Sequence, residues 1–192
     1  MSSELRVPKK FEDFAYVLDY LPTGKIGAGR AIYMAEPLVQ IIGRDFFTIL
    51  EAVPKINVTF DIHEKIYIGK DKPRDKIDHI IGRIEYGSLT SDAKSELPFI
   101  LDEIVKETGK RFVDFFNNAQ AMTPRMNALE LIPGIGKKYM WTILKAREKK
   151  PFISFQDINE RTGVPDMAKL VVKRILEELS KEPKYRVFTR PS

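Results

Sequence analysis

The sequence predicts an α+β fold, in which a small antiparallel β-barrel comes first and an all-α domain follows it. Up to about residue 90, short runs rich in aromatic and β-branched residues alternate with turn residues, which is typical of β-strands. Beyond residue 90, apolar residues recur every three or four positions, the spacing of one helix face. The first half has no helical stretch long enough to connect parallel strands, so we expect its strands to pair antiparallel.

Five or six short strands are expected in the first half, enough for a barrel of the OB type. In chain order they are 14–21, two strands within 37–53 around a tight turn at 43–45, then 56–62, 65–69 and 78–89. Successive side chains point to opposite faces of a strand, so about half of the aromatic residues here should point inward. We expect most of these residues to lie in the core: Tyr16, Tyr20, Phe46, Phe47 and Tyr67.

Helices are expected from residue 91 onward. Thr90 or Ser91 is a suitable N-cap for the first helix, and Gly109 is expected to end it. A second, amphipathic helix should follow, with phenylalanine side chains facing the core. From 123 to 180 the pattern indicates short helices joined by tight links. The predicted parts are an OB-like β-barrel at 10–90, connecting helices at 91–122, an all-α domain at 123–182 and a basic tail at 183–192.

Positive charge is concentrated in the last third of the chain. The net charge is +5, but residues 1–120 hold 17 Lys and Arg against 19 Asp and Glu, whereas residues 121–192 hold 15 against 8. This bias indicates either a polyanionic partner or a surface that only favours solubility. In the tail, cations alternate with aromatic residues, so base stacking, packing and disorder all stay open for it.

Composition disfavours several classes of function. No apolar run approaches the ~18–20 residues that cross a bilayer, and the chain does not start with an apolar signal segment, so we expect a cytoplasmic protein without membrane contact. There is no cysteine, and His63 and His79 lie on different segments. The glycines between Gly24 and Arg30 fit no phosphate-loop spacing, and the 71–79 loop mixes acids with lysines as solvated loops do. We expect no cofactor, no metal site and no catalytic residue.

The segment 132–138 has the composition of a tight corner between two helices. Pro133 cannot continue the preceding helix, and Gly134 can adopt a positive φ at no steric cost. Ile135 should anchor the turn in the core. Gly136 should let the backbone pass close to a neighbour.

Lys137 and Lys138 open the helix that follows this corner. A helix N-terminus is positive, so two lysines there are mildly unfavourable unless an anion lies beside them. Phosphate would bind the free N–H groups of the helix start and neutralise both lysines. Lys145 would extend the positive charge of Lys137 and Lys138 along the helix into a basic track. Trp141 on the same helix is expected to be a packing residue. A plain helical corner with incidental lysines is the alternative.

Residues 132–138 resemble the helix-hairpin-helix motif, which grips nucleic-acid backbones without reading sequence. The stretch 143–175 resembles the second half of a tandem repeat, which makes 123–182 a tandem helix-hairpin-helix domain. With segments such as EPLVQIIG, IDHIIGRIEYGSLT and FQDINERTGVPD, the chain from about 10 to 180 resembles a family of uncharacterised archaeal proteins predicted to bind RNA. The predicted nucleic-acid-binding residues are Pro133, Gly134, Ile135, Gly136, Lys137, Lys138 and Lys145.

A second hairpin is expected at 162–166, with Ser154 capping the helix before it. Pro165 stands where the motif has its second glycine, and proline offers no N–H group. Asp166 would repel phosphate, so we expect it to cap the last helix instead. We interpret this second hairpin as structural.

The leading hypothesis is a non-enzymatic nucleic-acid-binding protein, with RNA favoured over DNA. The first hairpin would grip the phosphate backbone, and the barrel would provide a second contact surface. The alternatives are a DNA-binding or repair-associated helix-hairpin-helix protein and a protein–protein interaction module. A helix-hairpin-helix glycosylase would place a catalytic aspartate near Asp157. The surrounding SFQDINERTG, however, does not match the sequence expected around such an aspartate.

Overall fold

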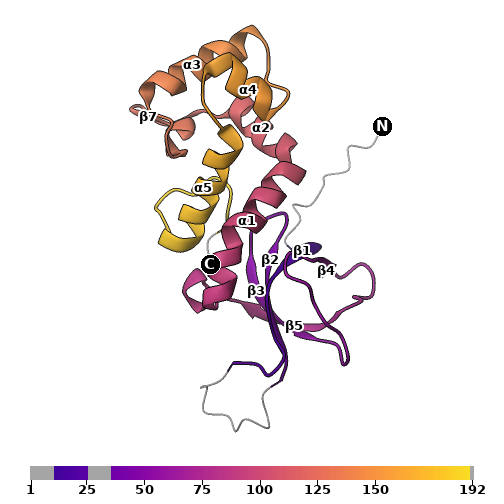
Figure 1. Cartoon of the computed structure of the whole chain (residues 1–192). Helices are drawn as coiled ribbons and strands as arrows, with labels where there is room; N and C mark the ends of the chain where they lie inside the picture. The colour runs from indigo at the N-terminus through magenta and orange to yellow at the C-terminus, as the bar shows by residue number, and fades with distance from the viewer. Residues whose placement is uncertain (1–10, 26–35, 191–192) are drawn as a thin grey trace, which may run out of the picture. The chain divides into compact units, whose positions relative to one another are not determined.

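The computed structural model describes residues 11–25 and 36–190 of the chain. Within these ranges the chain divides into two compact units, one up to residue 93 and one from residue 94 onward (Figure 1). The part of the predicted glycine loop beyond Lys25 lies outside the described residues, as do the last two residues of the predicted tail.

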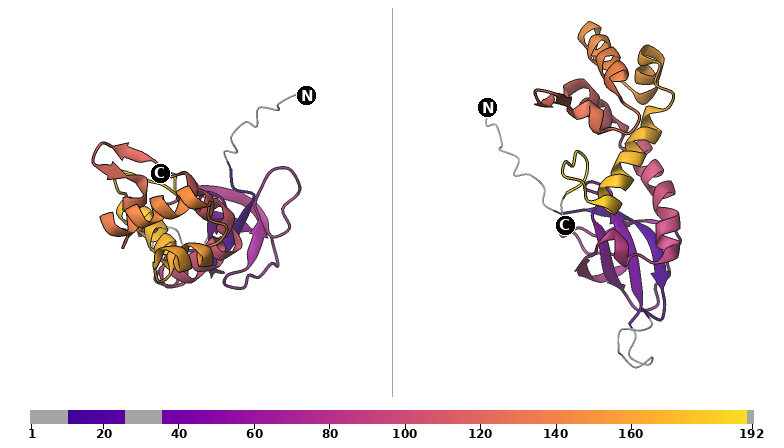
Figure 2. Two further views of the ribbon diagram at one scale, coloured as in Figure 1. Left: turned by 90° about the horizontal axis from the view of Figure 1, so that it is seen from above. Right: turned by 90° about the vertical axis from the view of Figure 1, so that its left-hand side faces the viewer.

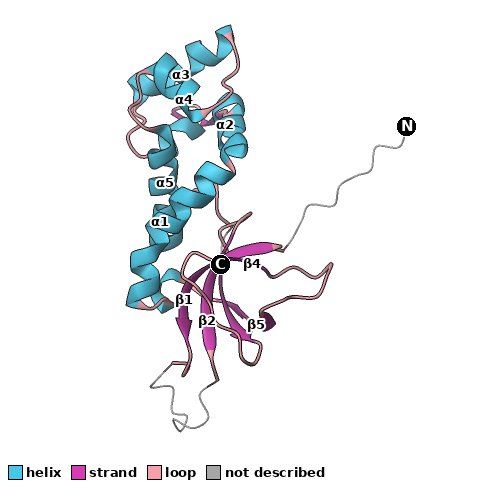
Figure 3. Ribbon diagram, turned by 45° about the vertical axis from the view of Figure 1, so that its right-hand side comes forward, coloured by secondary structure: helices cyan, strands magenta, loops and turns pink. Residues whose placement is uncertain are grey.

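The first unit is an antiparallel sheet of five strands that curls into a half-barrel (Figure 3). Its strands are β1 Phe14–Leu21, β2 Leu38–Gly43, β3 Ile49–Pro54, β4 Lys65–Tyr67 and β5 Ile77–Arg83, with a short 3-10 helix, η2, at Tyr86–Ser88. Their order in the sheet is β4–β1–β2–β3–β5, and every neighbouring pair is antiparallel. The expected antiparallel architecture is therefore confirmed as a curled sheet, whose edges among the described strands are β4 and β5.

Alternating residues of the central strands build the core of this unit. Ala15 and Val17 of β1 and Val39 and Ile41 of β2 are fully buried in one cluster. Burial of a side chain the size of Val17, Val39 or Ile41 contributes ~1.5–3 kcal/mol. The aromatic residues predicted for the core divide into two that are buried, Tyr16 and Phe47, and three that are half-buried, Tyr20, Phe46 and Tyr67.

The strand predicted at 56–62 is wrong, because this segment is a loop between β3 and β4. Asn57 has a φ of 60°, so the chain turns where the prediction extends it. Ile56 is 90% exposed, so the apolar positions of the alternating pattern do not share a buried face. Phe60 does pack inward, with its ring centroid 5.2 Å from that of Tyr20. Phe60 therefore anchors this loop to the core of the unit.

A buried carboxylate holds the connection between β2 and β3, a feature that the sequence did not reveal. Glu12 accepts hydrogen bonds from the backbone N–H groups of Asp45, Phe46 and Thr48 at 2.8, 2.9 and 3.2 Å. Burial raises the pKa of Glu12 above its ordinary value, while these hydrogen bonds act in the opposite direction. The turn is thus longer than the predicted 43–45, and a residue from before β1 fixes it.

The second unit is helical, with a small two-stranded sheet that the sequence did not predict. Its elements are α1 Ser91–Glu107, which starts in the first unit, α2 Gly109–Asn118, β6 Ala121–Thr123, β7 Met126–Asn127, the 3-10 helix η3 Ala128–Leu131, α3 Lys137–Lys149, α4 Phe155–Thr162 and α5 Met167–Lys181. Helix α3 packs beside α4, and α4 packs beside α5 (Figure 2).

The predicted helix caps are confirmed. The side chains of Thr90, Ser154 and Asp166 each accept the backbone N–H of the residue three positions later, at 3.0, 3.0 and 3.1 Å. Gly109 was predicted to end the first helix. This prediction is wrong, because Gly109 is the first residue of α2. Thr108 alone separates the two helices, so the helical direction changes within one residue.

The chain after α5 packs against the helical unit. The fully buried carboxylate of Glu178 accepts the successive N–H groups of residues 187–189 at 2.7, 3.1 and 2.9 Å. The ring of Phe188 meets that of Phe112 edge-on, with centroids 5.2 Å apart. Of the options left open for the tail, packing is the one found over 183–190.

Candidate functional site

The predicted hairpin, residues 132–136, connects η3 to α3. Ile132 and Ile135 are buried, and the N–H of Ile135 donates to the carbonyl of Ile132 at 3.0 Å. Pro133 and Gly134 are the central residues of this turn, and Gly134 has a φ of +90°, as the third residue of a type II turn does. The positive φ predicted for Gly134 and the burial predicted for Ile135 are confirmed.

Gly136 is the N-cap of α3 and leaves the helix start open. Its φ of −86° and ψ of −175° describe extended backbone that any residue adopts. A Cβ atom at this position would meet no described atom within 4 Å. The prediction that Gly136 lets the backbone pass close to another part of the chain is therefore wrong. The missing side chain instead leaves space directly in front of α3.

The first backbone N–H groups of α3 lack partners. A helix start has four N–H groups without an acceptor inside the helix, and here they run from Gly136 to Tyr139. Among the described residues, no side chain or carbonyl accepts them, and the first backbone hydrogen bond of the helix joins Met140 to Gly136 at 2.9 Å. Four donors thus stand at one helix end, next to the open space at Gly136.

The two lysines of the hairpin differ in their partners. The Nζ of Lys137 lies 2.9 Å from a carboxylate oxygen of Glu130 and donates to the carbonyl of Arg125 at 2.9 Å. Lys138 is exposed, and no acceptor in the described part of the chain pairs with its ammonium group. Lys138 is therefore available to an external anion, whereas Lys137 is partly neutralised by Glu130.

Glu130 belongs to this site, although we did not predict it. Its carboxylate accepts the N–H of Asn127 at 2.8 Å, and the Asn127 side chain in turn accepts the N–H of Leu129, which forms a capping box. The hydrogen bond from Asn127, then that from Lys137, hold the pKa of Glu130 below its ordinary value, so Glu130 is an anion at neutral pH. The N-x-x-E pattern at 127–130 was the signal for this cap.

The basic track continues along α3. Lys145 lines a shallow hollow of about 370 Å³ together with Thr142, Ala146, Lys149 and Arg161. Within the described residues, no acidic group pairs with the Lys145 ammonium. The predicted extension of the track by Lys145 is thus present as an exposed cation two turns from the hairpin.

Trp141 is not the packing residue that we predicted, since it is 57% exposed. The buried face of α3 carries Met140 and Ile143, and Trp141 lies off that face. The helical periodicity alone did not reveal this, because the face that is covered depends on where the rest of the unit packs.

The second hairpin contrasts with the first. Gly163 has a φ of +75° and ends α4. The N–H of Met167 donates to the side-chain oxygen of Asn159 at 2.9 Å, and Asp166 caps the N–H of Lys169. Two of the first N–H groups of α5, those of Met167 and Lys169, thus have acceptors within the protein, and the predicted Asp166 cap places a carboxylate at this helix start.

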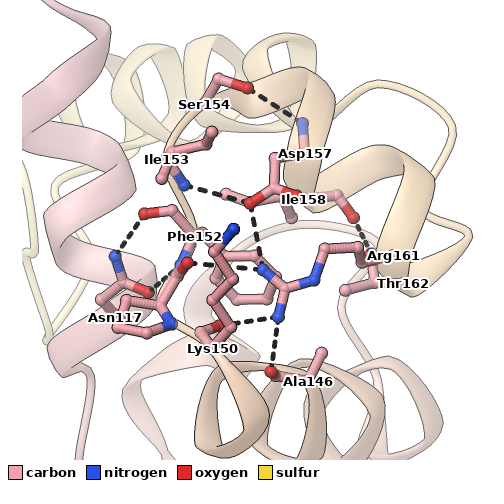
Figure 4. A network of polar contacts seen from close by, with 11 residues as sticks. Asn117, Ala146, Lys150, Phe152, Ile153, Ser154, Asp157, Ile158, Arg161 and Thr162 are labelled. Carbon is pink, nitrogen blue, oxygen red and sulfur yellow. Dashed lines mark hydrogen bonds and ion pairs between the residues drawn. The ribbon is translucent and has the colours of Figure 1, made fainter.

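The link between α3 and α4 is held by a polar network around Arg161 (Figure 4). Arg161 donates to the carbonyls of Ala146 and Lys150 at 2.6 and 2.7 Å and pairs with Asp157 at 3.0 Å. Partial burial opposes ionisation of Asp157, but hydrogen bonds from the Ile153 N–H and Arg161 outweigh it and lower its pKa. These contacts give Asp157 a structural role in this loop.

The half-barrel carries a basic hollow of its own. It measures about 360 Å³ and is lined by Lys55, Gly69, Lys70, Lys72, Arg74, Ile77 and Asp78. The Nζ of Lys70 lies 4.1 Å from the ring centroid of Phe11, which is 59% exposed, and that of Lys72 lies 4.6 Å from the ring centroid of Tyr67. Cations and accessible aromatic rings therefore meet on this surface.

The described residues contain no group of three or more His, Asp or Glu side chains placed to hold a metal ion. Asp78 and His79, whose side chains pair at 2.7 Å, lie on β5 and not in the loop expected at 71–79. None of the helices in the described ranges is both long and apolar enough to span a membrane.

These features define a two-unit α+β protein with a curled antiparallel sheet and a helical unit that has an open, lysine-flanked helix start. The chain belongs to the DUF655 family, described as proteins of unknown function, whose model matches residues 11–190. It is 46% identical over 185 residues to the uncharacterised protein MJ0038 of Methanocaldococcus jannaschii. The aligned region covers 95% of this chain and 82% of the relative.

A solved structure supports the same assignment. The crystal structure of Af1531 from Archaeoglobus fulgidus, which carries the same family description, has a TM-score of 0.85 and 43% sequence identity. The similarity covers 93% of this chain and all of Af1531. The resemblance to an uncharacterised archaeal family is thus confirmed as family membership.

Proposed function

We propose that this protein binds nucleic acid without catalysis, with RNA favoured over DNA, by holding backbone phosphate at the start of α3. In this proposal the hairpin at 132–136 and the one at 162–166 are tandem helix-hairpin-helix repeats, of which only the first binds. The observation that carries the proposal is the contrast between them. The first leaves its helix N–H groups and Lys138 without partners among the described residues, whereas the second provides acceptors for the N–H groups of Met167 and Lys169 and places the Asp166 carboxylate beside them.

The chemistry of the first hairpin suits a phosphate group. The unpaired N–H groups from Gly136 to Tyr139 donate to its oxygens, and the helix dipole favours its negative charge. Lys138 adds a charge-assisted contact, and Lys137 adds a second once it moves away from Glu130. Contacts of this kind go to the backbone alone, so the hairpin would not read the base sequence.

The half-barrel supplies a second contact surface in this proposal. Its strand number and antiparallel pairing are those of an OB-like barrel that is not closed. Lys70 and Lys72 of the basic hollow each lie beside an aromatic ring, that of Phe11 and that of Tyr67, and single strands bind such mixtures of cations and rings by charge and stacking.

The test is a charge reversal at two lysines of α3 that have no partner among the described residues, Lys138→Glu with Lys145→Glu. We expect the affinity for a short RNA to fall about a hundredfold, because charge-assisted hydrogen bonds are lost and repulsion replaces them. The matched control is Lys169→Glu with Lys173→Glu, which reverses two exposed lysines on α5. This control should change the affinity much less.

Equal losses in both double variants would contradict a site at the first hairpin, because they would show that only net charge matters. Affinity measured in parallel on RNA and on DNA of the same sequence tests the preference, and tighter DNA binding would favour the repair-associated alternative. A wild-type protein that binds neither would favour the interaction-module alternative.

A further inference from the structure

We propose that the exposed face of α3 binds a single-stranded segment, with a base stacked on Trp141 while the hairpin holds the adjoining phosphate. This inference rests on the nucleic-acid binding proposed above and names the form of nucleic acid that the site takes. The observation behind it is an accessible indole ring among three lysines, of which Lys138 and Lys145 have no partner in the described residues.

Trp141 is available for stacking. It is the single tryptophan of the chain, and 57% of it is exposed. Other aromatic residues of the helical unit pack on one another: Phe112 and Phe115 both meet Phe188 edge-on. Within the described residues, the ring of Trp141 contacts no other aromatic ring and no cation.

The charges around Trp141 favour a polyanion. Lys137 lies four residues before Trp141, Lys138 three residues before it and Lys145 four residues after it. At these spacings all three are neighbours of Trp141 on the helix surface. Helix α3 carries four lysines and one arginine against a single acid, Glu148. The other carboxylate near this face, Glu130 of η3, is engaged by Lys137.

The position of Trp141 matches the proposed phosphate site. It lies four residues from Lys137, about 6 Å along the helix axis from the first turn. A nucleotide whose phosphate binds the open N–H groups therefore has its base, or that of its neighbour, within reach of the indole ring. In a duplex the base faces are covered by stacking and pairing, so the ring would gain a partner only from a single strand.

The experiment uses the fluorescence of this one tryptophan in the full chain. A short oligouridylate should bind and quench the emission, because its bases stack on the ring. An oligomer with the same backbone but no bases should bind more weakly, by about tenfold, and should leave the emission unchanged.

The variants separate stacking from charge. Trp141→Ala should lose about tenfold in affinity for oligouridylate and nothing for the base-free oligomer, and Trp141→Phe should recover part of the loss. The control Phe99→Ala removes another exposed aromatic residue, on α1, and should bind as wild type does.

Stacking on Trp141 is overturned if Trp141→Ala binds both oligomers as wild type does. In that outcome phosphate binding at the hairpin would still stand, since Lys138→Glu with Lys145→Glu tests it independently. If wild-type protein binds neither oligomer, both proposals fail together.

Discussion

Gly134 and Gly136 have opposite roles, although one residue separates them. Gly134 needs its positive φ of +90° to complete the turn after Pro133. Gly136 has a φ that any residue adopts and open space where its side chain would be. The fold therefore explains the first glycine but not the second, whereas the phosphate that we propose at the start of α3 would explain the second.

Alanine at each position should separate these roles. We expect Gly134→Ala to lower the free energy of unfolding by about 1–2 kcal/mol, the cost of a left-handed backbone with a Cβ. Gly136→Ala should change stability less but weaken RNA binding, because its Cβ stands in front of the open N–H groups. Thermal denaturation and RNA titration of both variants check this. Wild-type affinity in Gly136→Ala would show that the space is not used.

Glu130 forms an ion pair with Lys137 and would compete with the proposed phosphate for it. We expect Glu130→Gln to keep the cap, because glutamine also serves at this position, and to free Lys137. The affinity for RNA should rise a few-fold, and the slope of log K against log salt should become steeper by about 0.7, the value for one more phosphate contact on a single strand. Binding titrations over a salt series measure both, and an unchanged slope would mean that Lys137 gains no phosphate.

The same residue makes a prediction about pH. The pKa of Glu130 is lower in the folded state than its ordinary value of 4.5, so its ionised form stabilises the fold above that value. This stabilisation disappears as the pH falls through the lowered pKa. The difference in melting temperature between wild type and Glu130→Gln should therefore shrink between about pH 6 and about pH 3. A difference that does not change with pH would contradict this linkage.

At the scale of elements, α3 and α5 both follow a glycine-containing turn, but their first turns differ in what satisfies them. The α5 start has Asn159 and Asp166 as acceptors, and the α3 start has none within the described residues. Acceptors at a helix start stabilise the helix, and the open start of α3 is where we propose that phosphate binds.

The Asp166→Ala variant tests the structural role of the second hairpin. Loss of an N-cap costs about 1 kcal/mol, so the melting temperature should fall while RNA affinity stays at the wild-type value. The matched control is Asp166→Asn, since asparagine caps as well as aspartate does and also removes the charge. If both variants gained RNA affinity, the carboxylate rather than the cap geometry would be what keeps this hairpin from binding.

The elements that the sequence predicted well are those whose residue types determine a local conformation. Pro133 with Gly134 specifies a turn, and Ser154 and Asp166 specify helix starts, because each acts within three or four residues of itself. The strand predicted at 56–62 failed, because its alternation needed a partner strand and Asn57 turns the chain instead.

The parts of the site that the sequence missed depend on contacts across a turn. Glu130 reaches Lys137 only because the hairpin folds η3 back on α3. Trp141 is exposed because the rest of the unit packs on the opposite side of α3, where Ile143 lies. Neither arrangement has a signature in residue spacing alone.

At the scale of the whole molecule, the positive charge lies where the candidate site lies. The surplus of basic residues falls entirely in 121–192, which contains the first hairpin and α3. The family match covers both the half-barrel and the helical unit, and the two archaeal relatives match over nearly the full length of this chain. Both units thus belong to one conserved architecture, and the helical unit holds the site that we propose for phosphate.

A titration of the ¹⁵N-labelled full chain with oligouridylate, followed by backbone amide NMR, tests the phosphate site most directly. We expect the largest shifts at the N–H groups of Gly136, Lys137 and Lys138, because phosphate becomes their hydrogen-bond acceptor. The indole N–H of Trp141 should shift with them, and the amides of 163–167 should stay in place. Binding with large shifts at the second hairpin and none at Gly136–Lys138 would contradict phosphate binding at the first hairpin.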